Sequence, residues 1–340
     1  MNTTSDIWWR QITGARNFLQ KTADALTNGK SAVICLAENT PWLNKMREVL
    51  TDFLQKKFGG RKTVRKIDAS TVDKPDIFVF ENFCSEDVQA QLIPIDEDAY
   101  VKFLANCTDS DLNDACVWIR GANKNQAADW YAFVADYRKF GGEGIFLVET
   151  GADCDLVGKA GVEIFSAEDE ISEYDCFAFN MFIAAQFGKG DKFTKRYLAE
   201  LAANATGLDV ERAAECIKLG NGFLKNPAAV LTNKTRDEVH RAVWITQLKL
   251  IFPLLEIFRR DFVTKYESQI KNRLPYTVSD RKKIFEPDEA ELGDLYSIFV
   301  GGWEIEPHDW AKLKDFRDAR NKLAHLETLT AEQVQTLLNS

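Results

Sequence analysis

The sequence predicts a multidomain protein with an α/β front and an all-α back, and three observations support this division. Up to about residue 170, short apolar runs rich in β-branched residues alternate with segments of helical pattern. Beyond that point every patterned segment is helical. The chain has 340 residues, which is too long for one typical core. We therefore expect an α/β domain over residues 1–170, a small helical domain over 171–233 and a helical bundle over 234–340.

The composition is that of a globular protein in a reducing compartment, with 45% hydrophobic and 28% charged residues. The seven cysteines are scattered without a C-x-x-C pair, and there are three histidines, so neither a disulfide framework nor a metal site is expected. The first ten residues lack the apolar core of an export signal, and no apolar run is long enough to cross a bilayer. We expect a cytoplasmic protein without membrane contact and without a cofactor.

The net charge of −9 argues against a protein whose whole surface binds nucleic acid. The acidity lies in the front, because residues 234–340 carry 17 basic and 18 acidic side chains. Two basic clusters in this back part are candidates for contact with RNA phosphates, although charge runs are more often solvated faces. The residues predicted to bind RNA are Arg259, Arg260, Arg281, Lys282 and Lys283.

The runs expected to form strands are residues 32–36, 63–67, 77–80, 115–119, 144–148 and, more weakly, 162–165. Continuous apolar strands of this kind are typical of a parallel sheet that is covered on both faces. Segments 42–56 and 127–138 carry apolar residues at three- and four-residue steps and are expected to be helices between strands. Alternation of this kind indicates a mostly parallel α/β domain.

This order resembles the P-loop NTPase core of the AAA or STAND type. A Gly-Lys-Ser run at residues 29–31 is similar to the end of a Walker A motif, but it precedes the first strand, whereas a phosphate loop follows it. Segment 37–45 after that strand has no glycine, and its Glu38 and Trp42 would repel or obstruct a triphosphate. Arg120 stands where a magnesium-binding carboxylate is expected. We predict an NTPase-like fold without ATPase activity; the alternative is an unrelated α/β domain.

The remaining segments have helical patterns. The expected helices are 177–187, 193–204, 209–219, 236–274, 292–300, 307–325 and 331–338. Pro253 is expected to break or kink the longest of them. Long helices with short connections suggest an antiparallel bundle.

The helix over 307–325 has an apolar stripe, and Arg320 projects into it. The stripe consists of Trp310, Leu313, Phe316, Leu323 and Ala324. A buried arginine needs a partner, for which Glu256 is one possibility. Asn321 and His325 share the neighbouring face, whereas Arg320 and His325 meet only if the helix end distorts or if two copies of the chain pair.

The string Arg320-Asn321-x-x-x-His325 resembles the R-x4-6-H motif of HEPN domains. HEPN domains are helical bundles that commonly dimerise, and many are metal-independent ribonucleases. The resemblance implies a composite site in which His325 transfers protons, Arg320 holds the scissile phosphate and Asn321 supports both. In the structural alternative, Arg320 forms an internal ion pair and His325 interacts with the helix dipole.

Two functions follow from these resemblances. The first is a metal-independent RNA endonuclease effector of the HEPN type, controlled by an inactive NTPase-like domain in a prokaryotic antiviral or toxin-like system. The second is a non-enzymatic scaffold or regulatory subunit of a defence complex that uses the helical bundle for dimerisation. The expected partners are RNA, a second copy of the chain in a homodimer, and proteins of a defence complex.

Overall fold

The computed structural model describes residues 3–152, 156–279, 282–300 and 304–339. The chain forms two compact units. The first comprises Met1–Phe179 with Asp209–Glu211, and the second comprises Asn180–Leu208 with Arg212–Ser340. The boundaries predicted at residues 170 and 233 stay a prediction, because compactness alone divides the chain at Phe179. Within the described ranges no helix is long and apolar enough to span a membrane.

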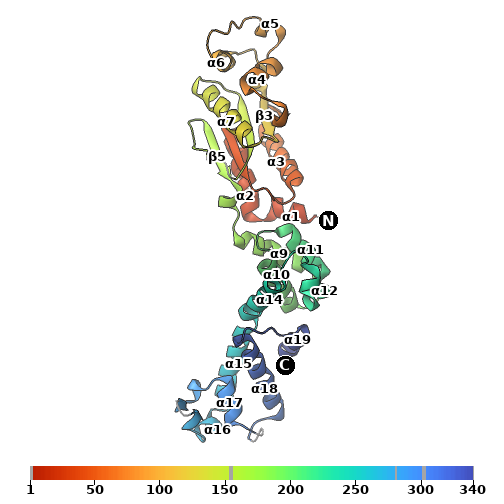
Figure 1. Cartoon of the computed structure of the whole chain (residues 1–340), viewed down its shortest axis with the longest axis vertical. Helices are drawn as coiled ribbons and strands as arrows, with labels where there is room; N and C mark the ends of the chain where they lie inside the picture. The colour runs from red at the N-terminus through yellow and green to blue at the C-terminus, as the bar shows by residue number, and fades with distance from the viewer. Residues whose placement is uncertain (1–2, 153–155, 280–281, 301–303, 340) are drawn as a thin grey trace. The chain divides into compact units, whose positions relative to one another are not determined.

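The first unit is built on a five-stranded parallel sheet in the order β2-β3-β4-β1-β5 (Figure 1). Its strands are β1 (Ser31–Leu36), β2 (Thr63–Asp68), β3 (Ala115–Arg120), β4 (Ile145–Gly151) and β5 (Val162–Ser166). Every residue of β1 is buried, as are nearly all of those in β3 and β4, because helices cover both faces. The predicted parallel sheet is therefore confirmed, and its α/β layers agree with an NTPase-like architecture.

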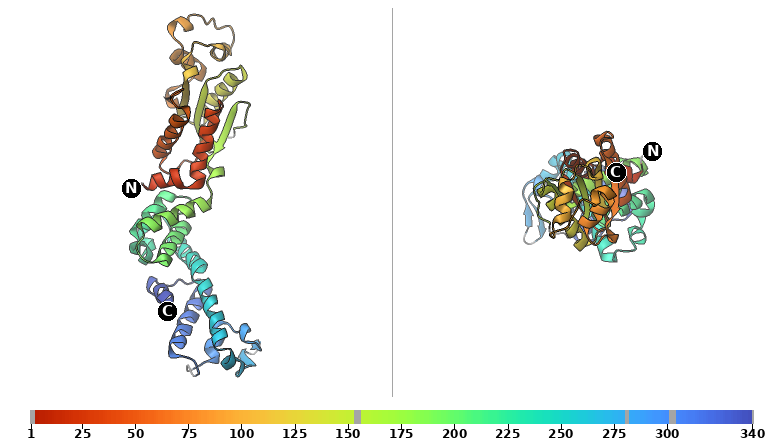
Figure 2. Two further views of the ribbon diagram at one scale, coloured as in Figure 1. Left: turned by 180° about the vertical axis from the view of Figure 1, so that it is seen from behind. Right: turned by 90° about the horizontal axis from the view of Figure 1, so that it is seen from above.

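Helices α1 (Thr4–Gln11), α2 (Thr13–Thr27) and α3 (Leu43–Phe58) pack together in one layer, and α2 and α3 run side by side when the unit is seen from behind (Figure 2). Helix α7 (Lys124–Lys139) lies against β4 and β5 with α4 (Pro75–Phe83) and α6 (Ala99–Asn106). Short helices α5 (Glu86–Gln89) and α8 (Ala167–Glu170) complete the unit. Alternate strand residues such as Val117 and Ile119 share one core with the aromatic side chains of α7.

The strand predicted at residues 77–80 is wrong, since this run lies inside α4. Pro75 occupies the first turn of the helix, where its fixed φ is compatible with helical backbone. A short apolar run does not distinguish a strand from a buried helix. In the folded unit, Phe78 contacts the ring of Trp130 and Phe80 contacts Tyr100, so the run is apolar because it packs between helices.

Among its described residues, the second unit is helical apart from two short strands, and α9 (Glu173–Phe187) contributes residues to both units. Its further helices are α10 (Lys192–Thr206), α11 (Val210–Leu219), α12 (Asn221–Lys225), α13 (Pro227–Val230), α14 (Arg236–Leu250), α15 (Phe252–Lys265), α16 (Glu267–Lys271), α17 (Leu292–Ile298), α18 (Pro307–Ala324) and α19 (Ala331–Asn339). The predicted break is confirmed, because Pro253 stands in the first turn of α15. Strands β6 (Tyr276–Ser279) and β7 (Lys282–Ile284) form an antiparallel hairpin where we expected a loop.

Candidate functional site

Ligands of open parallel sheets bind at the carboxyl ends of the strands, so the segment after β1 is a candidate ligand site. It leads into α3 through Trp42, whose backbone is left-handed with φ 42° and ψ 52°. That conformation is strained for a bulky residue and persists only where neighbours hold it. Trp9 Nε1 donates a hydrogen bond to the carbonyl of Pro41 at 2.9 Å, and the Trp42 ring lies 5.8 Å from that of Phe179. The loop is therefore fixed from both sides.

The backbone N–H of Trp42 donates a hydrogen bond to the carboxylate of Glu211, in the first turn of α11. In a P-loop protein, phosphate binds at the N-terminus of the helix that follows the first strand, where unpaired N–H groups and the helix dipole favour an anion. Here a protein carboxylate takes that position. The missing glycine in segment 37–45 was a sequence sign that no phosphate binds here, but no local pattern indicated that Glu211 supplies the anion.

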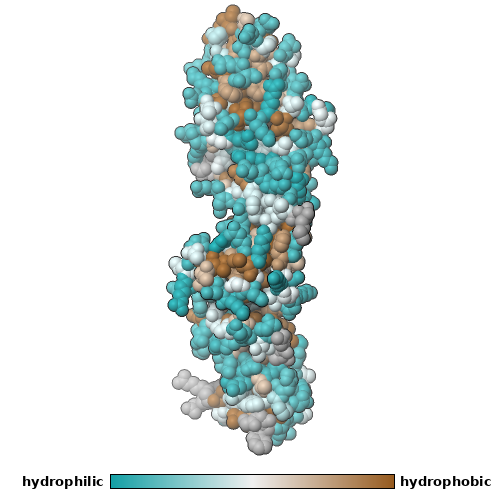
Figure 3. Space-filling model, turned by 90° about the vertical axis from the view of Figure 1, so that its right-hand side faces the viewer, coloured by the Kyte–Doolittle hydropathy of each residue, from teal (hydrophilic) through white to brown (hydrophobic). Residues whose placement is uncertain are grey.

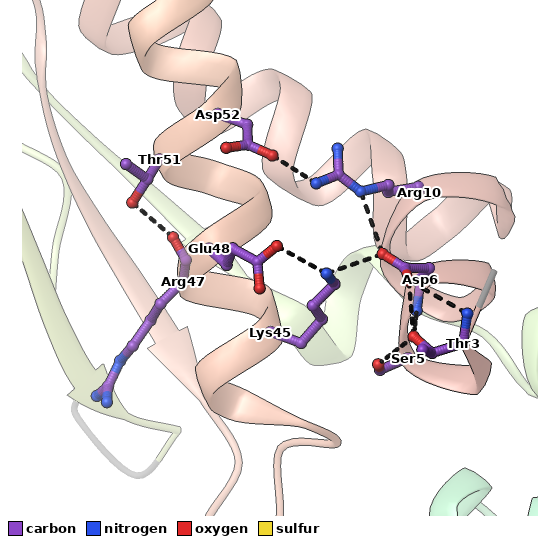
Figure 4. A network of polar contacts seen from close by, with 9 residues as sticks. All are labelled: Thr3, Ser5, Asp6, Arg10, Lys45, Arg47, Glu48, Thr51 and Asp52. Atoms are coloured by element: carbon purple, nitrogen blue, oxygen red, sulfur yellow. Dashed lines mark hydrogen bonds and ion pairs between the residues drawn. The ribbon is translucent and has the colours of Figure 1, made fainter. Parts of the chain in front are cut away.

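Lys45, in the first turn of α3, belongs to a network of polar contacts between α3 and α1 (Figure 4). Its Nζ bonds Asp6 Oδ1 at 2.9 Å and Glu48 Oε1 at 2.7 Å. The hydrogen bonds from Lys45 and Thr3 hold the pKa of the Asp6 carboxyl well below its usual range, and the bonds to Glu48 and Asp6 raise the pKa of Lys45. The ammonium group of Lys45 is therefore bound by two carboxylates, and its contact with Asp6 connects α3 to α1.

Glu149 lies near the carboxyl end of β4 and is 5% exposed. Arg47 of α3 binds it in a bidentate ion pair, with Nε 3.0 Å from Oε1 and Nη2 2.5 Å from Oε2. In β1, the neighbouring strand, Ile34 stands opposite Glu149. We did not predict this site. The available signal was an acidic residue in an otherwise apolar strand, which is rarely buried without a partner.

At the end of β3, Arg120 lies close enough to Asp68 to lower the pKa of that carboxyl, after the larger effect of the hydrogen bonds from Ser70. Ser70 Oγ donates to Asp68 at 2.6 Å. Among the residues that the structure describes, no three His, Cys, Asp or Glu side chains are grouped so that they could hold a metal ion.

In the second unit, Arg320 pairs with Glu291 at 2.5 Å rather than with Glu256, and its side chain is 34% exposed. It lines a cavity of about 250 Å³ whose other walls are mostly acidic. The charged residues around Arg320 are Glu256, Arg259, Asp288, Glu289 and Glu291. Four of these five residues carry carboxylates, which would repel an RNA phosphate. The surroundings of Arg320 therefore suit an internal ion pair.

The rest of the predicted site is dispersed. His325 is the C-cap of α18, where its backbone N–H donates to the carbonyl of Asn321 at 3.0 Å, and both side chains are exposed. No hydrogen bond or ion pair among the described residues joins the side chains of Arg320, Asn321 and His325. The stripe of α18 also differs from the prediction, because Ala324 is exposed and Ala319 is buried in its place.

The predicted RNA-binding residues lie in different surroundings. Arg259 binds Glu256 at 2.8 Å and the carbonyls of Asp288 and Ala290, so its guanidinium is used inside the molecule. Arg260 is 72% exposed beside Asp261. Arg281 lies outside the described residues, the backbone of Lys282 belongs to β7, and Lys283 of the same strand is exposed. RNA binding by these side chains stays a prediction.

A larger cleft of about 800 Å³ lies among α10, α12, α14 and α19. Buried Gln247 forms its wall and donates to Tyr197 Oη at 3.0 Å and to the carbonyl of Leu329 at 2.9 Å. Its Oε1 also accepts from the N–H of Leu329 at 2.8 Å. Burial raises the pKa of Tyr197 to about 12. The sequence signal for this cleft was a glutamine among the apolar residues of a helix, and the sequence-based prediction missed it.

No protein-family model and no curated protein matches the chain. Two solved structures are similar to it, the ORC1 protein of Aeropyrum pernix in complex with DNA and the ORC2 protein of Aeropyrum pernix in ADPNP-ADP complexes. Each is 11% identical with a TM-score of 0.32, and each match covers 95% of this chain and 89% or 92% of the other. At that TM-score the likeness carries no argument about activity or ligands.

The predicted RNA endonuclease effector of the HEPN type is wrong. No protein-family model matches the chain, and this includes any HEPN model. The geometry agrees, because Arg320 is bound by Glu291 inside an acidic cavity. The alternative of a non-enzymatic scaffold or regulatory subunit of a defence complex is not supported by any of the comparisons and is dropped. Homodimer formation stays a prediction.

Proposed function

We propose that this chain is a nucleotide-independent, peptide-binding protein. Its NTPase-like α/β unit is held in one conformation by its own carboxylate, and its helical unit receives a peptide segment of a partner protein in the cleft beside Gln247. The observation that carries the first part is the hydrogen bond from the Trp42 N–H to Glu211.

Three polar groups near the start of α3 and the end of β4 all have partners within the chain. Glu211 takes the anion position at the start of α3. Lys45 is held by Asp6 and Glu48. The carboxylate of Glu149 is neutralised by Arg47. A triphosphate would have to displace the Glu211 carboxylate from the start of α3 and then lie close to this like charge. The helix N-terminus would stabilise the phosphate by only about 0.3–1 kcal/mol in return. We therefore expect no competitive nucleotide binding.

The peptide class of ligand is supported by the way the cleft already holds backbone. Gln247 binds both the N–H and the C=O of Leu329 in its own chain, because a side-chain amide has a donor and an acceptor that can pair with extended backbone. The cleft volume of about 800 Å³ is within the range of ligand sites. Its lining combines apolar Phe193 and Leu201 with a few polar groups, which suits alternating side chains.

Nucleotide independence is tested by equilibrium dialysis of the full chain against ATP, ADP and GTP with magnesium. We expect no binding at millimolar nucleotide by the wild type. Glu211→Ala frees the start of α3, and Glu215→Ala is the matched control, because Glu215 lies on the same helix and pairs with Arg212 at the surface. Saturable binding of any of these nucleotides by the wild type at micromolar concentrations would refute the proposal.

The cleft is tested by selecting peptides from a random displayed library on the wild-type chain. Val243 lines the cleft, so Val243→Trp fills it, whereas His240→Trp adds the same side chain at an exposed position of α14 outside it. Selected peptides should bind the wild type and His240→Trp but lose at least about tenfold in affinity for Val243→Trp, or 1.4 kcal/mol. Equal binding to all three proteins would place the peptide elsewhere.

A further inference from the structure

Between β2 and β3 the chain makes an excursion whose two ends are Cys84 and Cys107, and several of its apolar side chains, among them Val88, Val101 and Leu104, still pack in the core of the unit. Helix α4 ends at Phe83 and helix α6 ends at Asn106, and the residues that follow them, Cys84 and Cys107, are their C-caps. Residues 85–106 between them form α5, a loop and α6, at one end of the first unit (Figure 1). The two cysteines therefore stand at the base of the excursion.

The packing of α4 against α6 places the two cysteines side by side. The rings of Phe80 and Phe103 lie in edge contact with their centroids 5.6 Å apart. Cys84 and Cys107 each follow one of these phenylalanines by four residues, which is one helical turn along the same face. The Cys107 thiol lies close enough to Cys84 to raise the pKa of the Cys84 thiol, after the larger effect of burial, and Gln89 Nε2 donates a hydrogen bond to the carbonyl of Cys84 at 2.8 Å.

We infer that Cys84 and Cys107 form a reversible disulfide with a low-molecular-weight disulfide such as oxidised glutathione. Both are free thiols here, and they differ in access: Cys84 is buried, whereas Cys107 is half-buried. The inference is independent of the proposed peptide-binding function.

The exchange proceeds in two balanced steps. The thiolate of Cys107, which has given its proton to water, attacks one sulfur of glutathione disulfide, and one glutathione thiolate leaves as the mixed disulfide forms. The sulfur of Cys84, losing its own proton, then attacks the Cys107 sulfur and releases the second glutathione. Two protein thiols are oxidised and one glutathione disulfide is reduced to two thiols. Burial raises the pKa of Cys84 to about 11, so the second step is the slow one.

A disulfide between Cys84 and Cys107 would link the two ends of the excursion covalently. The loop of the excursion carries two exposed isoleucines, Ile93 at 77% and Ile95 at 86% exposure. Figure 3 shows apolar surface at this end of the first unit. In the reduced chain, aromatic contacts between α4 and α6 hold the base together. The disulfide would add a covalent restraint and slow the local opening of residues 85–106.

The test is to incubate the full chain with millimolar oxidised glutathione, alkylate it under denaturing conditions and map its peptides by mass spectrometry. We expect a linked pair of peptides containing Cys84 and Cys107, with two hydrogens lost, which reverts on reduction. Cys116, buried in β3, should stay alkylated as an internal control. Amide exchange over residues 85–106 should slow in the oxidised wild type.

Two serine variants separate the steps. Cys84→Ser should stop at the mixed disulfide and accumulate glutathione on Cys107. Cys107→Ser should remain unmodified at Cys84 and show no change in amide exchange. Full alkylation of both cysteines in the treated wild type, or linkage of Cys107 to a different cysteine, would overturn the inference.

Discussion

Breaking the buried ion pair between Arg47 and Glu149 is the most direct test of how the α/β unit is built. Arg47→Met keeps the apolar part of the side chain but leaves the Glu149 carboxylate, 5% exposed, without its cation. Removing one partner of a buried pair costs about 3–5 kcal/mol, because the other charge stays desolvated. The Arg47 side chain is 22% exposed, so water reaches part of the site and we expect the lower figure, about 3 kcal/mol.

The double variant Arg47→Met/Glu149→Met removes both charges and fills their volume with apolar atoms. Such replacements are neutral or stabilising, so the double variant should recover at least about 2 kcal/mol relative to Arg47→Met. For a unit of roughly 180 residues, a loss of about 3 kcal/mol corresponds to a fall in Tm of roughly 6–12 °C.

The assay is thermal unfolding followed by tryptophan emission and circular dichroism. Trp8, Trp118 and Trp130 are fully buried in this unit and report its opening. A fall of less than about 1 kcal/mol in Arg47→Met, or a double variant no more stable than the single one, would show that the pair is not a desolvated ion pair.

Three further variants test other contacts. Asp6→Asn removes a carboxylate whose folded pKa is lowered by Lys45, so it should cost up to about 1 kcal/mol at neutral pH. That difference from wild type should shrink in urea unfolding as the pH falls from the unfolded pKa near 3.8 toward the much lower folded pKa, because the unfolded wild type then binds a proton that the folded protein does not bind. Gln247→Leu leaves the N–H and C=O of buried Leu329 without partners and should lower the free energy of unfolding of the helical unit by about 2–3 kcal/mol, measured in urea. Phe316→Ala, at a position 4% exposed, should cost about 3–5 kcal/mol by the same measurement, and a cost below 1 kcal/mol would mean that the α15–α18 contact is not a packed core.

The elements that could be predicted from the sequence are those encoded by short-range patterns. The apolar run of β1 required burial on both faces, and therefore helices on both sides of a parallel sheet. Pro253 had to stand in a first turn or break a helix, and it begins α15. The run within α4 was misassigned because four apolar residues fit a strand or a buried helix equally well, and only its packing against α6 and α7 decides.

The candidate sites depended on contacts that no local pattern contains. Trp42 and Glu211 are 169 residues apart, Arg47 and Glu149 are 102 apart, and Gln247 and Leu329 are 82 apart. Taken alone, each of these side chains could equally be an exposed residue or part of the regular pattern of a helix or strand, so the sequence does not indicate its partner.

The HEPN-like string fails for the same reason. Arginine and histidine can act on a phosphate only where the arginine is free to bind it. Here Arg320 is bound by Glu291, which lies 29 residues upstream and outside the motif. The sequence by itself determined which segments form the sheet and most of the helices, since backbone hydrogen bonding and apolar periodicity act over a few residues. Only the tertiary structure decided which charges are neutralised and which helix N-terminus already holds an anion, because those interactions depend on distance in space.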